Sequence, residues 1–102
     1  MPSTYALVTV RVPKRVDVWT APSLAKDLEE KIQAGITIVL DLTQTQFIEP
    51  ASANVLLEGL VKSRARHARM TLRGVNPQVK VVLEMAGVLK HFRRKCSANH
   101  SS

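Results

Sequence analysis

The sequence predicts a single α/β domain with a mixed, mostly parallel β-sheet packed with helices, in the order β-β-α-β-α-β-α. Two kinds of strand pattern support this prediction. Residues 5–12 alternate between apolar side chains and others, as a half-buried strand does, and residues 36–42 are nearly continuous and β-branched, as a buried strand is. Three further segments repeat apolar residues at helical spacing. Strands that alternate with helices form right-handed parallel crossovers.

The first third of the chain predicts two strands and a helix. Pro13 opens a turn after residues 5–12, and residues 16–18 form a short strand that closes an antiparallel hairpin with the first. A helix follows, with the Thr20 hydroxyl as its cap and Gly35 as its stop. Its apolar stripe consists of Leu24, Leu28 and Ile32.

The middle of the chain predicts the centre of the sheet. Residues 36–42 form a strand that helices cover on both faces, and the next helix begins near Pro50. This helix ends in the basic stretch 64–69, where cations interact favourably with the helix dipole. Its predicted core stripe consists of Ala53, Leu56, Leu57, Leu60 and Val61.

The last part of the chain predicts one more strand and one more helix. Residues 70–75 form the strand, Asn76 caps the helix with Pro77 at its first position, and Gly87 ends it. Its apolar residues are Val79, Val82, Leu83 and Ala86, and Phe92 is expected to pack on the core. Residues 1–92 therefore form one domain, and residues 93–102 form a basic, flexible tail.

Composition narrows the class of protein. The chain is 45% hydrophobic and 23% charged over 102 residues, which is typical of one globular domain. No apolar run approaches the roughly 20 residues of a membrane helix, and the first residues do not resemble a signal peptide. We expect a cytoplasmic protein that is not embedded in a membrane. The single Cys96 is consistent with this expectation.

The net charge of +7 is unevenly distributed. Residues 1–58 carry five Lys or Arg against seven Asp or Glu, whereas residues 59–102 carry ten against one. Such a basic half attracts nucleic acid, an anionic membrane surface or an acidic protein. Because Phe92 is the only aromatic residue in this half, we expect no nucleic-acid partner.

The sequence offers little support for an enzyme or a cofactor. His67, His91 and His100 have no Cys, Asp or Glu at metal-ligand spacing, and no nucleophile or phosphate-loop motif occurs. Three carboxylates could gather at the strand ends, namely Asp17, Asp41 and Glu49. The simpler interpretation is that Asp17 and Asp41 hold loops in place. We expect no catalysis, no metal and no cofactor.

Three segments resemble the STAS family, the domain of bacterial anti-sigma-factor antagonists and of sulfate-transporter tails. Residues 16–22 (VDVWTAP) are similar to the family's segment between the second strand and the first helix. Residues 38–48 (IVLDLTQTQFI) are similar to its strand and loop before the second helix, and residues 82–92 to the end of its third helix. A departure is Lys14, where the family usually has glycine.

The resemblance implies regulation by partner switching. In the family, an unmodified antagonist binds an anti-sigma factor that is also a serine kinase, and phosphorylation of a serine at the second helix abolishes binding. Here Glu49 matches the aspartate before that serine, Pro50 matches the serine itself, and Ser52 matches a later glycine. Because proline has no hydroxyl, the usual switch cannot operate at residue 50. Ser52 could substitute as an acceptor if it were exposed, although a plain helix-start serine is the simpler interpretation.

The predicted function is therefore partner binding in transcription regulation, without phosphorylation at the usual position. The predicted contact surface consists of Asp17, Trp19, Thr20, Glu49, Pro50, Ala51, Ser52 and Asn54. Trp19 either packs in the core or, if exposed, anchors the partner. The partner is an anti-sigma-factor serine kinase. The alternative is an accessory subunit of a membrane transporter for lipids or anions, whose basic half faces anionic lipid or an acidic loop.

Overall fold

A three-stranded parallel sheet forms the centre of the domain in a computed structural model that describes residues 6–92. Its strands are β1 (Ala6–Arg11), β3 (Ile36–Asp41) and β5 (Arg69–Arg73), in the order β1-β3-β5. The nearly continuous apolar strand is central, as the sequence predicts. All three strands run in one direction, which confirms the parallel crossovers.

The predicted antiparallel hairpin does not form. Strand β2 (Arg15–Val16) leaves the line of β1 and pairs in parallel with β4 (Phe47–Ile48), which makes a separate two-stranded sheet. The connection explains the error. A tight hairpin needs residues with positive φ, such as Asn-Gly, and Pro13-Lys14 supplies none. The backbone carbonyl of Lys14 instead accepts hydrogen bonds from Gln46 and Phe47, at 2.8 and 3.1 Å.

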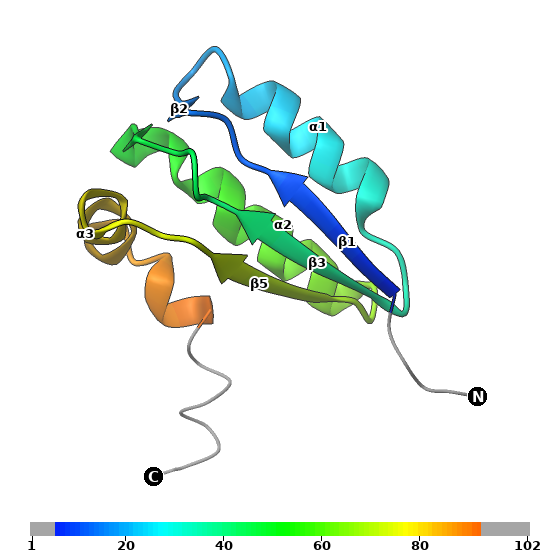
Figure 1. The fold of residues 1–102 in the computed structure, drawn as a ribbon. Coiled ribbons are helices and arrows are strands. Elements are labelled where there is room, and N and C mark those ends of the chain that lie inside the picture. Colours follow the sequence, from blue (N-terminus) through cyan, green and yellow to red (C-terminus); the bar gives the residue numbers. More distant parts are fainter. Residues whose placement is uncertain (1–5, 93–102) are drawn as a thin grey trace, which may run out of the picture.

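The predicted helices are present. They are α1 (Ala21–Lys31), α2 (Asn54–Ala65) and α3 (Pro77–Met85), and a 3-10 turn, η1 (Pro50–Ser52), precedes α2. Residues 89–92 are also helical. Figure 1 shows α1 alongside β1 and α3 at the far end of β5. The predicted tail, with Cys96 and His100, lies outside the described residues.

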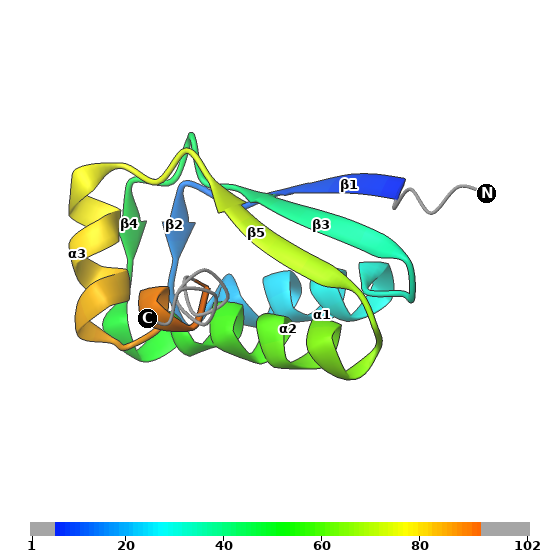
Figure 2. The ribbon, with the colours of Figure 1, turned by 90° about the horizontal axis from the view of Figure 1, so that it is seen from below.

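Both long helices lie on one face of the β1-β3-β5 sheet, so the prediction of a sheet covered on both faces is wrong. Figure 2 shows α1 and α2 below this sheet, while α3 lies beside β2 and β4. On the open face, Leu7 of β1 is 70% exposed, and Arg69 and Thr71 of β5 are also exposed. This one-sided burial accounts for the polar Thr9 and Arg11 on either side of the buried Val10, although Leu7 is apolar and exposed.

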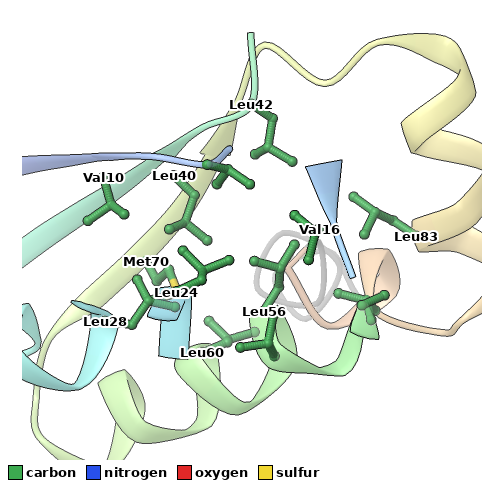
Figure 3. Packing of buried hydrophobic residues seen from close by; sticks show 14 of the residues in the cluster. Val10, Val16, Leu24, Leu28, Leu40, Leu42, Leu56, Leu60, Met70 and Leu83 are labelled. Atoms are coloured by element: carbon green, nitrogen blue, oxygen red, sulfur yellow. The ribbon is translucent and has the colours of Figure 1, made fainter. Parts of the chain in front are cut away.

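One hydrophobic core joins the two sheets. Figure 3 shows Leu24 and Leu28 of α1 and Leu60 of α2 beneath the main sheet, and Leu56 continuing toward Val16 of β2. Leu83 of α3 extends the same cluster, and Phe92 packs against it as predicted. Four of the five predicted α2 positions are buried or packed on the core, but Val61 is 56% exposed because its side chain lies on the solvent face of the helix.

The structure confirms the predicted cap of α3 but not that of α1. The Asn76 side chain caps α3 by accepting a hydrogen bond from the Val79 N–H at 2.9 Å, as predicted. Gly87, with φ +75°, ends the turn after this helix. The Thr20 hydroxyl does not cap α1, however, because it is engaged within the loop that precedes the helix.

No helix within residues 6–92 combines the length and apolar character that crossing a membrane requires.

Candidate functional site

The β2–β4 pair brings two loops of the predicted contact surface together. Val16 lies opposite Ile48, and the Glu49 N–H donates to the Val16 carbonyl oxygen at 2.8 Å. The loop of residues 17–20 and the segment 49–54 therefore start from neighbouring positions at the same ends of two parallel strands. This arrangement joins parts of the chain that are about 30 residues apart in sequence.

Asp17 organises the first loop. Its Oδ1 accepts hydrogen bonds from the backbone N–H groups of Trp19 at 3.0 Å and Thr20 at 3.2 Å, and its Oδ2 accepts from Arg15 Nε at 3.0 Å. Burial raises the pKa of Asp17, but these hydrogen bonds from Arg15, Trp19 and Thr20 outweigh it and lower the pKa. Asp17 thus holds a loop, as the sequence predicts.

Thr20 closes the same loop with its hydroxyl group. The hydroxyl oxygen accepts from the Asp17 N–H at 3.0 Å and donates to the Arg15 carbonyl oxygen at 2.9 Å. Its role is therefore local and ties the start of α1 to the end of β2. Because both ends of the loop are fixed, the residues between them have a defined position.

The fixed loop presents two apolar side chains to solvent. Trp19 is 85% exposed and Val18 is 60% exposed, so the interpretation of Trp19 as a core residue is wrong. The exposed Trp19 ring is carried by a backbone whose N–H donates to Asp17 Oδ1 at 3.0 Å. Exposed tryptophan is uncommon on a surface without a partner and is frequent among binding anchors.

The sequence does not single out three further exposed residues of this region, which are Val18, Arg15 and Phe47. The sequence pattern predicts Val18 in a strand and gives no signal that Arg15 or Phe47 belongs to the site. The Arg15 guanidinium carbon lies 4.7 Å from the centroid of the Phe47 ring, and Phe47 is 40% exposed. Only the β2–β4 pairing places these two side chains together, so no local pattern could identify them.

The second loop begins at Glu49 with Pro50 at the first position of η1. Pro50 and Ala51 are exposed, whereas Ser52 is only 8% exposed. The Ser52 hydroxyl donates to Glu49 Oε1 at 3.0 Å. Ser52 therefore lacks the exposure that a substitute phosphate acceptor would need, since the 3-10 turn directs this hydroxyl back to Glu49. Asn54 is exposed and donates to Glu58 at 3.5 Å.

Polar side chains hold the loop between β3 and β4, which leads into the second loop. Thr45 is fully buried, and its hydroxyl oxygen lies 3.2 Å from the Val12 carbonyl oxygen and 3.0 Å from that of Pro13. Asn76 donates to the Thr45 carbonyl oxygen at 2.8 Å. The loop between β3 and β4 is therefore held by the end of β1 and by the cap of α3.

Asp41 does not belong to the contact surface. It ends β3 in the other sheet, where its Oδ1 accepts from Thr43 and its Oδ2 accepts from Arg73 at 2.9 Å. The hydrogen bonds from Thr43, together with Arg73, lower the pKa of Asp41 to about 2. Asp41 ties down a loop, as predicted. Asp17 and Glu49 follow the adjoining ends of β2 and β4, and Asp41 is not with them.

Within residues 6–92, no three His, Cys, Asp or Glu side chains are grouped closely enough to hold a metal ion. His67 lies in the turn before β5 with φ +61°, and His91 lies near the end of the described chain, where its carbonyl oxygen accepts from Arg64 at 3.0 Å.

The architecture defines a small α/β domain in which paired parallel strands carry two adjoining loops at one end. The chain belongs to the STAS domain family, whose model matches residues 1–102. No curated protein sequence matches the chain.

Two solved structures share the fold at low sequence identity. The crystal structure of a sulfate transporter family protein from Wolinella succinogenes has a TM-score of 0.74 and 15% identity, and the match covers 84% of this chain and 70% of that one. The anti-sigma factor antagonist SpoIIAA in its unphosphorylated form has a TM-score of 0.69 and 20% identity, with coverage of 83% and 76%. These similarities establish the fold.

Proposed function

We propose that this chain is a regulatory protein-binding domain that resembles an anti-sigma-factor antagonist and is not switched by phosphorylation at residue 50. The contact surface, here called the loop surface, consists of Asp17, Trp19, Thr20, Glu49, Pro50, Ala51, Ser52 and Asn54. The main support is the exposure of Trp19, at 85%, on a loop that Asp17 and Thr20 hold in place.

The loop surface has the physical character of a binding site. A large side chain on a loop whose backbone is already fixed loses less conformational freedom on binding than one on a mobile loop, which favours affinity. Pro50 and Ala51 add a small, exposed and rigid apolar area at the adjoining strand end. Because Asp17 and Ser52 are engaged by neighbouring groups, the loop surface offers shape and apolar contact more than reactive groups.

Binding to serine-kinase anti-sigma factors from the source organism tests this proposal. We expect the purified chain to bind one of them, and Trp19→Ala to weaken that binding by about tenfold or more, as hot-spot aromatics do. Val61→Ala is the control, since Val61 is exposed on α2 outside the loop surface. Isothermal titration with and without nucleotide measures both variants. Failure of all these kinases to bind would contradict the proposal.

A restored serine tests the role of Pro50. In Pro50→Ser, a hydroxyl stands at the first position of η1, where the family carries its phosphorylated serine. We expect the cognate kinase to phosphorylate this variant and not the parent chain, and the phosphorylated form to lose binding because the added charge disrupts a fitted interface. Mass spectrometry after incubation with kinase and ATP measures the modification. Phosphorylation of Pro50→Ser at residue 50 that leaves binding unchanged would contradict the placing of residue 50 in the contact surface.

A transporter subunit is the second candidate function. The similarity to a sulfate transporter family protein favours it, as does the basic character of residues 59–102. In this case the chain would attach to a transporter for lipids or anions. Co-purification of the tagged chain with a transporter ATPase subunit would support it, provided that Trp19→Ala loses the complex and Val61→Ala keeps it.

A further inference from the structure

The outer edge of β1 is open and carries little protection against pairing. Among the strands within residues 6–92, β1 pairs with β3 alone. From Ala6 to Val10 it contains no charge, proline or glycine, and Leu7 is 70% exposed. Natural proteins usually protect such an edge with charges or proline. The other edge of the sheet, β5, has Arg69 and Arg73 at its ends.

A groove of about 500 Å³ lies at the end of this edge. Arg11 and Pro13 form one side, and α1 forms the other with one face of the helix. The remaining lining residues are Trp19, Thr20, Ser23, Leu24, Lys26, Asp27 and Glu30. Figure 1 shows α1 alongside the outer edge of β1, and Figure 2 shows it below the plane of the sheet. A strand added to β1 would therefore lie over this helix.

The charges along the groove favour an acidic ligand. Arg11 and Lys26 are exposed, and neither forms an ion pair within residues 6–92. Asp27 is already paired with Lys31, and Glu30 also interacts with Lys31. Asp27 is thus paired with a cation outside the groove, whereas Arg11 and Lys26 form no ion pair among the described residues. A carboxylate on the ligand would complement these cations.

We infer that the free edge of β1 and the groove beside α1 bind an extended, acidic segment of a partner protein as an added strand. The unpaired backbone groups of β1 would supply hydrogen bonds, Trp19 an apolar contact, and Arg11 and Lys26 the preference for acid. The edge lies outside the loop surface apart from Trp19 and Thr20.

Short peptides test this inference directly. The probe is a blocked hexapeptide of alternating valine and threonine with one glutamate, and it is added to the isotope-labelled chain for NMR. We expect saturable shifts of amides in β1 and along residues 23–30. A lysine in place of the glutamate should weaken binding by about fivefold or more. Methylation of alternate peptide nitrogens should abolish binding, because it removes the ladder donors.

Matched variants separate the contribution of the two cations from that of the strand edge. Arg11→Glu combined with Lys26→Glu should reverse the preference between the two peptides, whereas Lys80→Glu, an exposed change on α3, should not. Leu7→Glu should weaken binding of the glutamate peptide because it puts a like charge on the edge, and Val61→Glu should not. Thermal unfolding checks that each variant is folded.

Three results would overturn the inference. The first is a set of NMR shifts that does not include the amides of β1, and the second is equal binding of the glutamate and lysine peptides. The third is a dimer in sedimentation that Leu7→Glu dissociates, which would assign the edge to a second copy. Because Leu7, Arg11 and Lys26 lie outside the loop surface, these results do not depend on whether an anti-sigma factor binds there.

Discussion

At the residue scale, the carboxylate of Asp17 positions the loop that carries Trp19, the principal candidate anchor for a partner. Asp17 accepts hydrogen bonds from two consecutive backbone N–H groups and from Arg15, which shapes the loop and leaves Trp19 in solvent. Ser52, in contrast to Trp19, is not accessible to a partner, because its hydroxyl donates to Glu49 and the residue is largely buried. Neighbouring polar groups thus determine which of the predicted site residues a partner can reach.

A residue-scale prediction concerns acid stability. Hydrogen bonds from Thr43 and Arg73 lower the pKa of Asp41 to about 2 from its ordinary value of 3.8, so its ionised form is favoured in the folded state. Its stabilising contribution is therefore present above about pH 4 and is lost as the pH falls toward about 2. We expect Asp41→Asn to be less stable than the parent chain at pH 7, and the difference to shrink across this range.

Urea unfolding at pH 7, 4, 3 and 2.5 measures this effect. Glu29, which Arg66 and Lys62 hold at a pKa of about 2, titrates in the same range, so the acid sensitivity of Asp41→Asn is reduced and not abolished. Glu58→Gln on the exposed face of α2 is the control. Equal pH dependence of the parent chain and Asp41→Asn would contradict the assignment.

At the element scale, close contact between loops holds the sheet ends together. Gly74 follows β5 with φ +74°, and a Cβ at this position would lie 3.0 Å from the Thr43 backbone nitrogen and 3.1 Å from its Cα. The loop after β3 and the turn after β5 therefore meet backbone to backbone. Glycine meets both requirements here, a positive φ and the absence of a side chain.

Gly74→Ala should consequently destabilise the fold by more than its backbone conformation alone would cost. A left-handed conformation costs a non-glycine residue about 1–2 kcal/mol, and the contact with Thr43 adds to this. Gly35→Ala is a matched control, because Gly35 has φ +82° with no atom within 4 Å of its Cβ position. Chemical denaturation compares the two. If Gly74→Ala and Gly35→Ala lowered the free energy of unfolding by the same amount, the contact with Thr43 would carry no cost.

At the scale of the whole molecule, the short β2–β4 sheet depends on the core of the main sheet. Two strands of two residues each cannot form a stable sheet alone, and they are held because Val16 and Ile48 are fully buried in the common cluster. The loop surface stands on this small sheet. Its geometry is therefore a property of the whole core and not of the two loops.

Leu56→Ala tests this dependence. Leu56 is fully buried between the main sheet and β2, so the substitution should cost about 2–5 kcal/mol. Unfolding should remain a single transition by both tryptophan fluorescence and circular dichroism, because Trp19 adjoins β2. Val61→Ala on the same helix should change stability by no more than about 0.5 kcal/mol. Separate transitions for the two signals would show that the small sheet unfolds by itself.

The sequence by itself determined the helices, the central strand and the place of Pro50 at the start of the second helical segment. These features depend on apolar spacing, on caps such as Asn76 and on glycine or proline at element ends, all of which are local. The tertiary structure decided that β2 pairs with β4, that one face of the main sheet is open, that Ser52 is buried and that Trp19 is exposed. Each of these outcomes depends on which distant segment of the chain packs against the residue or strand concerned. The spacing of apolar residues, two in a strand or 3.6 in a helix, shows which face of an element is apolar. It does not show which other element will cover that face.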